Sequence, residues 1–109
     1  MKPPETLGRE ALKVWWRTVG ELRREPFWPR LDPKDVAAYC RAAVKQDKLL
    51  RRARRMAALH GRYSPEALTA RDEQSEHAEA YHAAAQRIGM TVPSRLALRR
   101  RRPVPPLED

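Results

Sequence analysis

A chain of 109 residues has room for one domain, and a domain of this length buries only about 60 to 70% of the surface that its unfolded chain exposes. The formal net charge of +9 at pH 7 indicates a polyanionic partner, while the single cysteine excludes an internal disulfide and fits a reducing cytoplasm. No signal peptide opens the chain and no run reaches the roughly 20 apolar residues of a membrane-spanning helix, so we expect a soluble protein with no membrane partner.

The N-terminal residues predict a flexible tail followed by an amphipathic helix. Paired prolines at positions 3 and 4 disfavour regular structure over residues 1–8, whereas a helical pattern begins at Arg9 and runs to about Arg24. The apolar stripe of this helix comprises Leu12, Trp15, Trp16, Val19 and Leu22. We expect the stripe to pack in a core, with base stacking by the tryptophans as the alternative.

The segment after this helix predicts an extended connection. Prolines at positions 26 and 29 surround Phe27 and Trp28, and proline cannot continue a helix or a tight turn here. The connection is too long for the turn of a standard DNA-binding helix-turn-helix. We therefore expect Phe27 and Trp28 to pack beneath the helices, with base stacking again as the alternative.

A long helix is predicted over residues 33–60. Asp32 can accept a hydrogen bond at its N-terminus, Pro33 suits the first turn, and Gly61 supplies the stop. At 1.5 Å per residue such a helix is about 42 Å long, with Tyr39 and Cys40 on its narrow apolar seam. A long helix with a narrow seam is typical of a helical hairpin.

The third helix is predicted over about residues 66–88, with Ser64 and Thr69 as alternative N-terminal caps and with Tyr81 and Ile88 on its apolar stripe. Residues 41–62 carry eight basic side chains and one acid, a net charge of +7, whereas residues 64–87 carry five acids and two arginines, a net charge of −3. Opposite charge predicts an antiparallel return. The side chains expected to pair are Arg51, Arg52, Arg54 and Arg55 with Asp72, Glu73, Glu76 and Glu79.

A short fourth helix is predicted over about residues 92–102, before three prolines that predict an extended tail over residues 103–109. Residues 9–102 therefore form one helical domain between two tails. The end of this helix carries four successive arginines, 99–102, with no acidic residue after them until Glu108. Their mutual repulsion indicates phosphate as the favoured partner, and a frayed basic end with no partner is the alternative.

The sequence contains no pattern that requires catalysis. Its three histidines, at positions 60, 77 and 82, have no zinc-ligand spacing with cysteine, and the four glycines are too scattered for a phosphate-binding loop. Cys40 has no activating histidine beside it and is expected to be a small buried apolar residue. We expect neither an enzyme nor a bound cofactor or metal.

Residues Ile88–Arg95, which read IGMTVPSR, nearly reproduce the signature leucine-glycine-leucine-threonine-proline-x-x-arginine. They follow, in order, Leu31–Asp35 and the pair Tyr39-Cys40, and together these segments resemble the small terminase subunit of tailed bacteriophages. Two departures are present: the proline falls one place later, at Pro93, and Ser64-Pro65 replaces the customary asparagine-proline before the third helix.

The resemblance implies an all-α protein with an N-terminal helix, a long helical hairpin and a short C-terminal helix, assembled as a ring-like homo-oligomer of about nine subunits. It also implies a non-enzymatic subunit of viral genome packaging. Such a subunit binds double-stranded viral DNA, delivers it to the large terminase subunit and regulates the ATPase and nuclease of that subunit, in the cytoplasm of the infected bacterial host.

We assign DNA contact first to the last helix and second to the long helix. The assigned side chains are Arg95, Arg99, Arg100, Arg101 and Arg102, then Arg51, Arg52, Arg54 and Arg55. Core or subunit contacts are assigned to Leu12, Trp15, Trp16, Val19, Tyr39, Cys40, Tyr81 and Ile88. For the long-helix arginines, pairing with acids of the third helix is the structural alternative.

Two other classes of function fit a small basic helical protein. The first is a transcriptional regulator that binds a DNA operator as a dimer, and a two-fold dimer instead of a large ring would indicate it. The second is an adaptor whose basic face binds a membrane or an acidic protein. Binding to DNA but not to anionic vesicles would argue against the adaptor.

Overall fold

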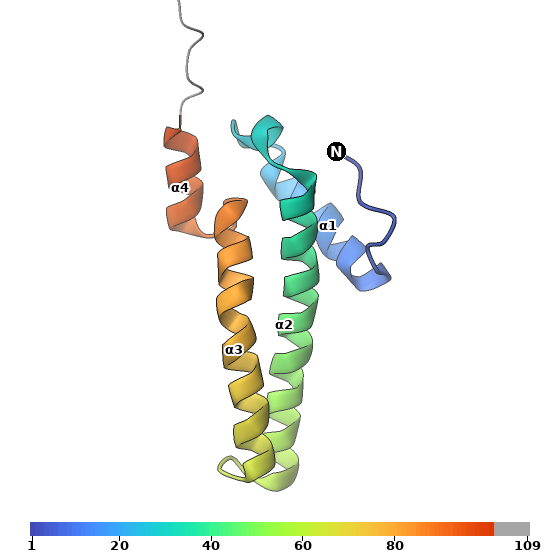
Figure 1. Cartoon of the computed structure of the whole chain (residues 1–109), viewed down its shortest axis with the longest axis vertical. Helices are drawn as coiled ribbons and strands as arrows, with labels where there is room; N and C mark the ends of the chain where they lie inside the picture. Colours follow the sequence, from blue (N-terminus) through green and yellow to red (C-terminus); the bar gives the residue numbers. More distant parts are fainter. Residues whose placement is uncertain (102–109) are drawn as a thin grey trace, which may run out of the picture.

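The computed structural model describes residues 1–101, which form an all-α structure without β-strands (Figure 1). The elements are α1 (Arg9–Leu22), the short 3-10 helix η1 (Trp28–Arg30), α2 (Pro33–His60), α3 (Pro65–Arg87) and α4 (Val92–Arg100). The all-α prediction is confirmed, and each helix lies within two residues of its predicted bounds. Arg102 and the predicted tail over residues 103–109 lie outside the described residues.

Three of the four α-helices begin in a similar way, with a capping side chain that a proline follows within two residues, in the first turn. Asp32 accepts a hydrogen bond from the Lys34 amide at 2.9 Å, and Ser64 accepts one from the Ala67 amide at 3.1 Å. Thr91 caps α4. Each cap satisfies an amide that has no partner inside its helix, and proline removes another such donor. Of the two caps considered for α3, Ser64 is the one used.

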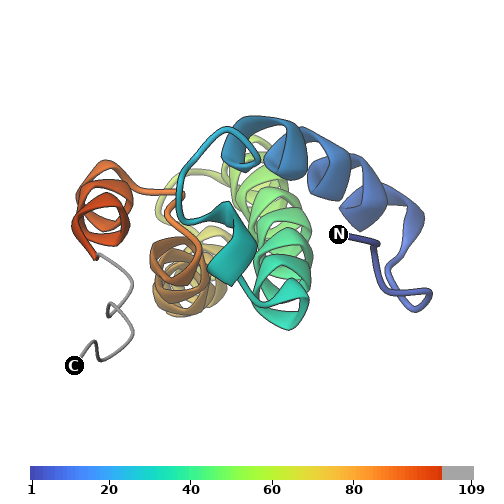
Figure 2. The ribbon, with the colours of Figure 1, turned by 90° about the horizontal axis from the view of Figure 1, so that it is seen from above.

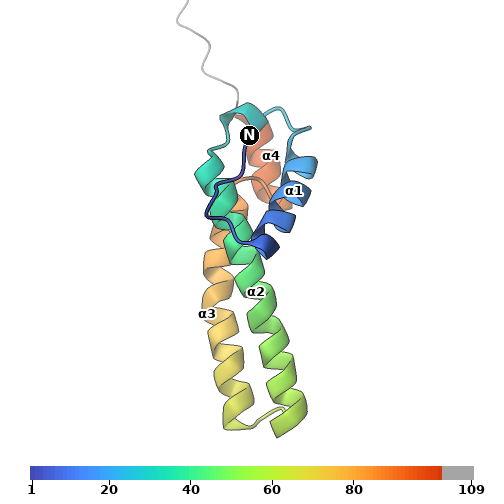
Figure 3. The same cartoon turned by 90° about the vertical axis from the view of Figure 1, so that its right-hand side faces the viewer.

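α2 and α3 form the long antiparallel hairpin that the sequence predicts (Figures 1 and 3). The turn between them contains Gly61, whose φ of 98° is open to glycine and costly for other residues. The far half of the hairpin buries only small side chains, Ala67 and Ala70, and leaves Leu59 and Tyr63 exposed at its tip. This part of the chain therefore has almost no core of its own.

α1 and α4 both lie at the open end of the hairpin, on opposite sides of it. Seen from above, α1 lies across α2, α4 lies beside the end of α3, and the segment with η1 passes over the top between them (Figure 2). The hydrophobic core is at this end. Its buried members are Leu7, Ala11, Trp15, Leu22, Phe27, Val36, Ala37, Tyr39, Cys40, Ala84, Ala85 and Ile88.

The structure separates the two adjacent tryptophans of α1. Trp15 is fully buried, whereas 55% of the Trp16 surface is exposed. Trp16 therefore does not belong to the core of the chain, because the next residue of a helix points about 100° away and only one of the two can face α2. Leu12, Val19 and Tyr81 are partly buried against the core, as their assignment requires.

The N-terminal segment also departs from expectation. Leu7 is buried, its amide donates to the Pro4 carbonyl at 3.1 Å, and Arg41 of α2 donates to the Thr6 hydroxyl at 3.1 Å. The last residues of the predicted flexible tail are thus attached to the domain. The proline pair ends regular helix but does not prevent the apolar side chain after it from packing.

No helix within residues 1–101 is both long enough and apolar enough to cross a membrane.

Candidate nucleic-acid interface

The residues of the Ile88–Arg95 segment build the joint between α3 and α4. Gly89 has a φ of 81°, the amide of Met90 donates to the Ala85 carbonyl at 2.8 Å, and the amide of Gly89 donates to Gln86. This pair of bonds is the glycine-dependent ending common at helix C-termini. A Cβ atom at Gly89 would lie 2.8 Å from Cζ of Phe27, so glycine is required here for space as well as for backbone conformation.

The N-terminus of α4 is closed by a reciprocal pair of side chains. The Ser94 amide donates to Oγ1 of Thr91 at 3.2 Å, and the Thr91 amide donates to Oγ of Ser94 at 3.3 Å. Pro93 lies in the first turn, where its missing N–H has no cost. The one-residue shift of the proline relative to the usual signature therefore leaves the cap intact.

Arg95, the last residue of the joint, has a structural role. Its Nε donates to the carbonyl of Gly89 at 2.8 Å, its Nη2 lies 3.5 Å from a carboxylate oxygen of Glu21 on α1, and only 24% of its side chain is exposed. The guanidinium thus ties the turn before α4 to α1. It is poorly placed to contact DNA while these bonds are made.

Arg99 makes a two-point ion pair with Glu25, just after α1. Nε of Arg99 donates to Oε2 of Glu25 at 2.8 Å and Nη2 donates to Oε1, while 9% of the Glu25 side chain is exposed. The expectation that the α4 arginines have no acidic partner is therefore wrong for Arg95 and Arg99. No acidic residue lies close to these arginines in the sequence, but the fold places the end of α1, with Glu21 and Glu25, next to α4.

A signal for this pairing was present in the sequence. Glu21 and Glu25 are four residues apart, as are Arg95 and Arg99, so two matched pairs can form between neighbouring helical turns. The remaining described arginines of this cluster, Arg100 and Arg101, are exposed, and the carbonyl of Arg101 accepts a hydrogen bond from Arg30 at 2.9 Å. Arg102 lies outside the described residues.

The ion pair with Arg99 predicts a pH dependence for the attachment of α4. The two hydrogen bonds from Arg99 lower the pKa of Glu25 from its usual value of 4.5. A lowered carboxyl pKa contributes stability that is present above the unfolded-state pKa and lost as the pH falls through the folded-state pKa. We therefore expect the wild-type protein to be more stable than Glu25→Gln at pH 7, with the difference shrinking below about pH 4.5.

Thermal unfolding of both proteins between pH 3 and pH 7, at equal concentration, measures this difference. Glu5→Gln is the matched control, because Glu5 is exposed and no ion pair to it is present within residues 1–101. A gap between the wild type and Glu25→Gln that stayed constant over this pH range would contradict a role for the Glu25 charge.

Fewer arginines of α2 pair with acids of α3 than the sequence predicted, so more of them are available to an anionic partner. Arg51 pairs with Asp47 of its own helix at 2.9 Å, and Arg52 lies 3.8 Å from Glu73 of α3. Within residues 1–101 neither Arg54 nor Arg55 makes an ion pair, and both are exposed. The expected pairing across the hairpin is thus confined to Arg52 and Glu73, so competition from α3 is weak.

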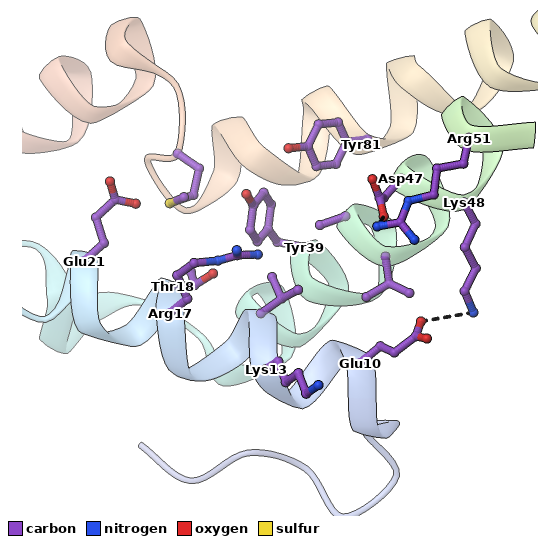
Figure 4. A pocket seen from close by; sticks show the side chains of 14 residues that line it. Glu10, Lys13, Arg17, Thr18, Glu21, Tyr39, Asp47, Lys48, Arg51 and Tyr81 are labelled. Atoms are coloured by element: carbon purple, nitrogen blue, oxygen red, sulfur yellow. Dashed lines mark ion pairs between the residues drawn. The ribbon is translucent and has the colours of Figure 1, made fainter. Parts of the chain in front are cut away.

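A groove of about 800 Å³ opens between α1, α2 and α3 (Figure 4). Tyr39 of α2 and Tyr81 of α3 stack in it, with ring centroids 5.7 Å apart. Burial raises the pKa of Tyr39, so its hydroxyl stays protonated at neutral pH. The charged side chains along the groove are Glu10, Lys13, Arg17, Glu21, Asp47, Lys48 and Arg51. Both signs occur together, which does not favour a polyanion in the groove.

Burial favours the neutral forms of Cys40 and His77. Burial raises the pKa of the Cys40 thiol to about 11, which keeps it protonated at neutral pH. Nδ1 of His77 donates to Gln46 at 2.9 Å, and burial lowers the pKa of His77, so the ring is neutral near pH 7. No group of three or more metal-binding side chains occurs in the part of the chain that the structure describes.

No protein-family model, no curated protein and no solved structure matches this chain.

Proposed function

We propose that this chain is a small terminase subunit, a non-enzymatic protein that binds double-stranded viral DNA. In this role it delivers the DNA to the large terminase subunit and regulates the ATPase and nuclease of that subunit, in the cytoplasm of an infected bacterium. The observation that carries the proposal is the Ile88–Arg95 segment, in which the signature glycine, threonine and arginine each have a distinct structural task.

Charge also supports a DNA partner. The chain carries a net charge of +9, and part of its basic surface lacks carboxylates to neutralise it. From the first assignment we retain Arg100 of α4, Arg101 just after it, and Arg54 and Arg55 of α2. These four are exposed and form no ion pair within residues 1–101. Phosphate is a favourable partner for such side chains, since binding releases the counterions that DNA condenses.

The elongated shape supports assembly into a homo-oligomeric ring. Much of the chain lies in a hairpin whose far half has almost no core, and large apolar side chains remain exposed in several places. They include Leu59, Tyr63 and Leu68 near the tip and Val92 and Leu96 on α4. Exposed apolar side chains of this size in a small monomer indicate contacts between molecules, and neighbouring subunits of a ring would cover them.

We expect the intact protein to form a homo-oligomer larger than a tetramer, about nine subunits in a closed ring. Native mass spectrometry at micromolar concentrations measures the subunit number directly, and the same preparation can be tested for retention of duplex DNA. A stable two-fold dimer that binds one operator sequence would support the transcriptional regulator instead. A monomer with no affinity for DNA would exclude both proposals.

A further inference from the structure

The outer face of α1 is a second basic surface, distinct from the arginines assigned above. The inner side of α1 faces the core, and its buried side chains are Ala11, Trp15, Thr18 and Leu22. Residues spaced by three, four or seven positions share one side of a helix. The side of α1 that points away from the core therefore carries Arg9 and Trp16, with Arg23 just after the helix. Lys13 and Arg17 lie at the edge of this side, where they also line the groove between α1 and the hairpin. All five side chains are exposed.

This outer face is mainly positive, and carboxylates occur only at its edge, beside the groove between α1 and the hairpin. Figure 4 shows Glu10 and Glu21 there together with Lys13 and Arg17. Both acids pair with other cations, Glu10 with Lys48 at 3.2 Å and Glu21 with Arg95. Within residues 1–101 the four cations of the outer face form no ion pair. Their charge is thus available to an anionic partner.

Trp16 lies in the middle of these cations. An indole that is 55% exposed loses the hydrophobic stabilisation that burial would provide, so its position indicates a surface that is covered by a partner. Gly20 lies one turn further along the helix, and a Cβ atom there would meet nothing within 4 Å. The helix surface beside the indole is therefore open to close approach.

The combination favours nucleic acid over the other possible partners. A second copy of the same face would bring like charges together, which opposes a two-fold contact. A membrane-binding helix inserts a broad apolar face, but the apolar side of α1 is already buried in the core and Trp16 alone remains. Phosphates satisfy the cations, and an exposed aromatic ring can pack against sugars or bases.

The dimensions also fit a DNA duplex. From Arg9 to Arg23 the outer face extends about 21 Å at 1.5 Å per residue, whereas the major groove of B-DNA is about 12 Å wide. The cations at the two ends of the face can therefore reach phosphates on both sides of one groove, with the indole between them.

We propose that the outer face of α1, with Trp16 between Arg9, Lys13, Arg17 and Arg23, is a docking surface for duplex DNA. This inference rests on the proposed function, in which the chain binds DNA, and adds a surface to the arginines of α2 and α4. The cations position the duplex by contacting phosphates, and the indole adds an uncharged contact.

Two variants with the same change in charge test the proposal. The first replaces Arg9, Lys13, Arg17 and Arg23 with glutamine, and the matched control replaces Lys34, Lys45, Arg71 and Arg87, exposed cations of α2 and α3. We expect the first variant to bind a duplex more weakly and to flatten the dependence of log K on log salt by about 0.9 for each phosphate that it no longer neutralises. An equal loss of affinity in the control would overturn the proposal, because only total charge would then matter.

Trp16→Ala provides a separate readout. We expect it to weaken duplex binding several-fold while the salt slope and the oligomer stay unchanged, because the indole is uncharged. Dissociation of the oligomer in this variant would instead identify an interface between copies and overturn the proposal. If the wild type binds no DNA, the proposed function and this inference both fail. If the wild type binds DNA and neither α1 variant changes affinity or slope, only the inference fails.

Discussion

Trp15→Ala is expected to destabilise the protein by about 3 to 5 kcal/mol. Trp15 is fully buried where α1 crosses α2, so alanine removes a large apolar surface and leaves a cavity that the surrounding helices cannot fill. Equilibrium unfolding in denaturant at fixed protein concentration gives the difference, since oligomers make stability depend on concentration.

The neighbouring tryptophan is the matched control for this experiment. Trp16→Ala should cost about 1 kcal/mol or less, because more than half of that side chain is exposed. Trp15→Phe should cost less than Trp15→Ala, since phenylalanine keeps most of the apolar volume and removes an indole Nε1 that is buried without a hydrogen-bond partner. Equal losses for Trp15→Ala and Trp16→Ala would mean that the core is assigned to the wrong side of α1.

Gly89→Ala is expected to lower stability by about 2 to 4 kcal/mol, from two causes that act together. The backbone at Gly89 has a φ of 81°, which a residue with a Cβ atom adopts at a cost. The new methyl group would also lie 2.8 Å from Cζ of Phe27 and 3.1 Å from Cδ1 of Leu98. Because Phe27 and Leu98 attach the η1 segment and α4 to this turn, α4 should be the first element to separate.

Gly61→Ala separates the two causes. Gly61 also has a positive φ, 98°, with a ψ of 149° that is almost restricted to glycine, but a Cβ atom there would meet nothing within 4 Å. Gly61→Ala therefore reports backbone strain without overpacking, and only Gly89→Ala should release α4. Hydrogen exchange of the α4 amides in both variants locates the effect. Equal protection of the α4 amides in both variants would show that the close approach of Phe27 does not contribute to the destabilisation.

Local chemistry in the sequence was sufficient to predict the helices of this protein. Asp32, Ser64 and Thr91 each supply a cap that a proline follows within two residues, and Gly61 and Gly89 each supply a stop with positive φ. Such signals act over a few residues and depend little on the rest of the fold, so the predicted bounds agree with the structure. Opposite charge on residues 41–62 and 64–87 likewise predicted the antiparallel hairpin.

Only the tertiary structure decided which side chains of these helices are buried, paired or exposed. The apolar stripe of α1 was wide enough to include both Trp15 and Trp16, and the position of α2 selected Trp15. Arg95 and Arg99 pair with Glu21 and Glu25, which lie 74 positions earlier in the chain. The matched spacing of four allows this pairing, but only the packing of α4 near the end of α1 selects it. Burial and ion pairing depend on how whole elements pack, whereas caps and stops depend on the few residues around them.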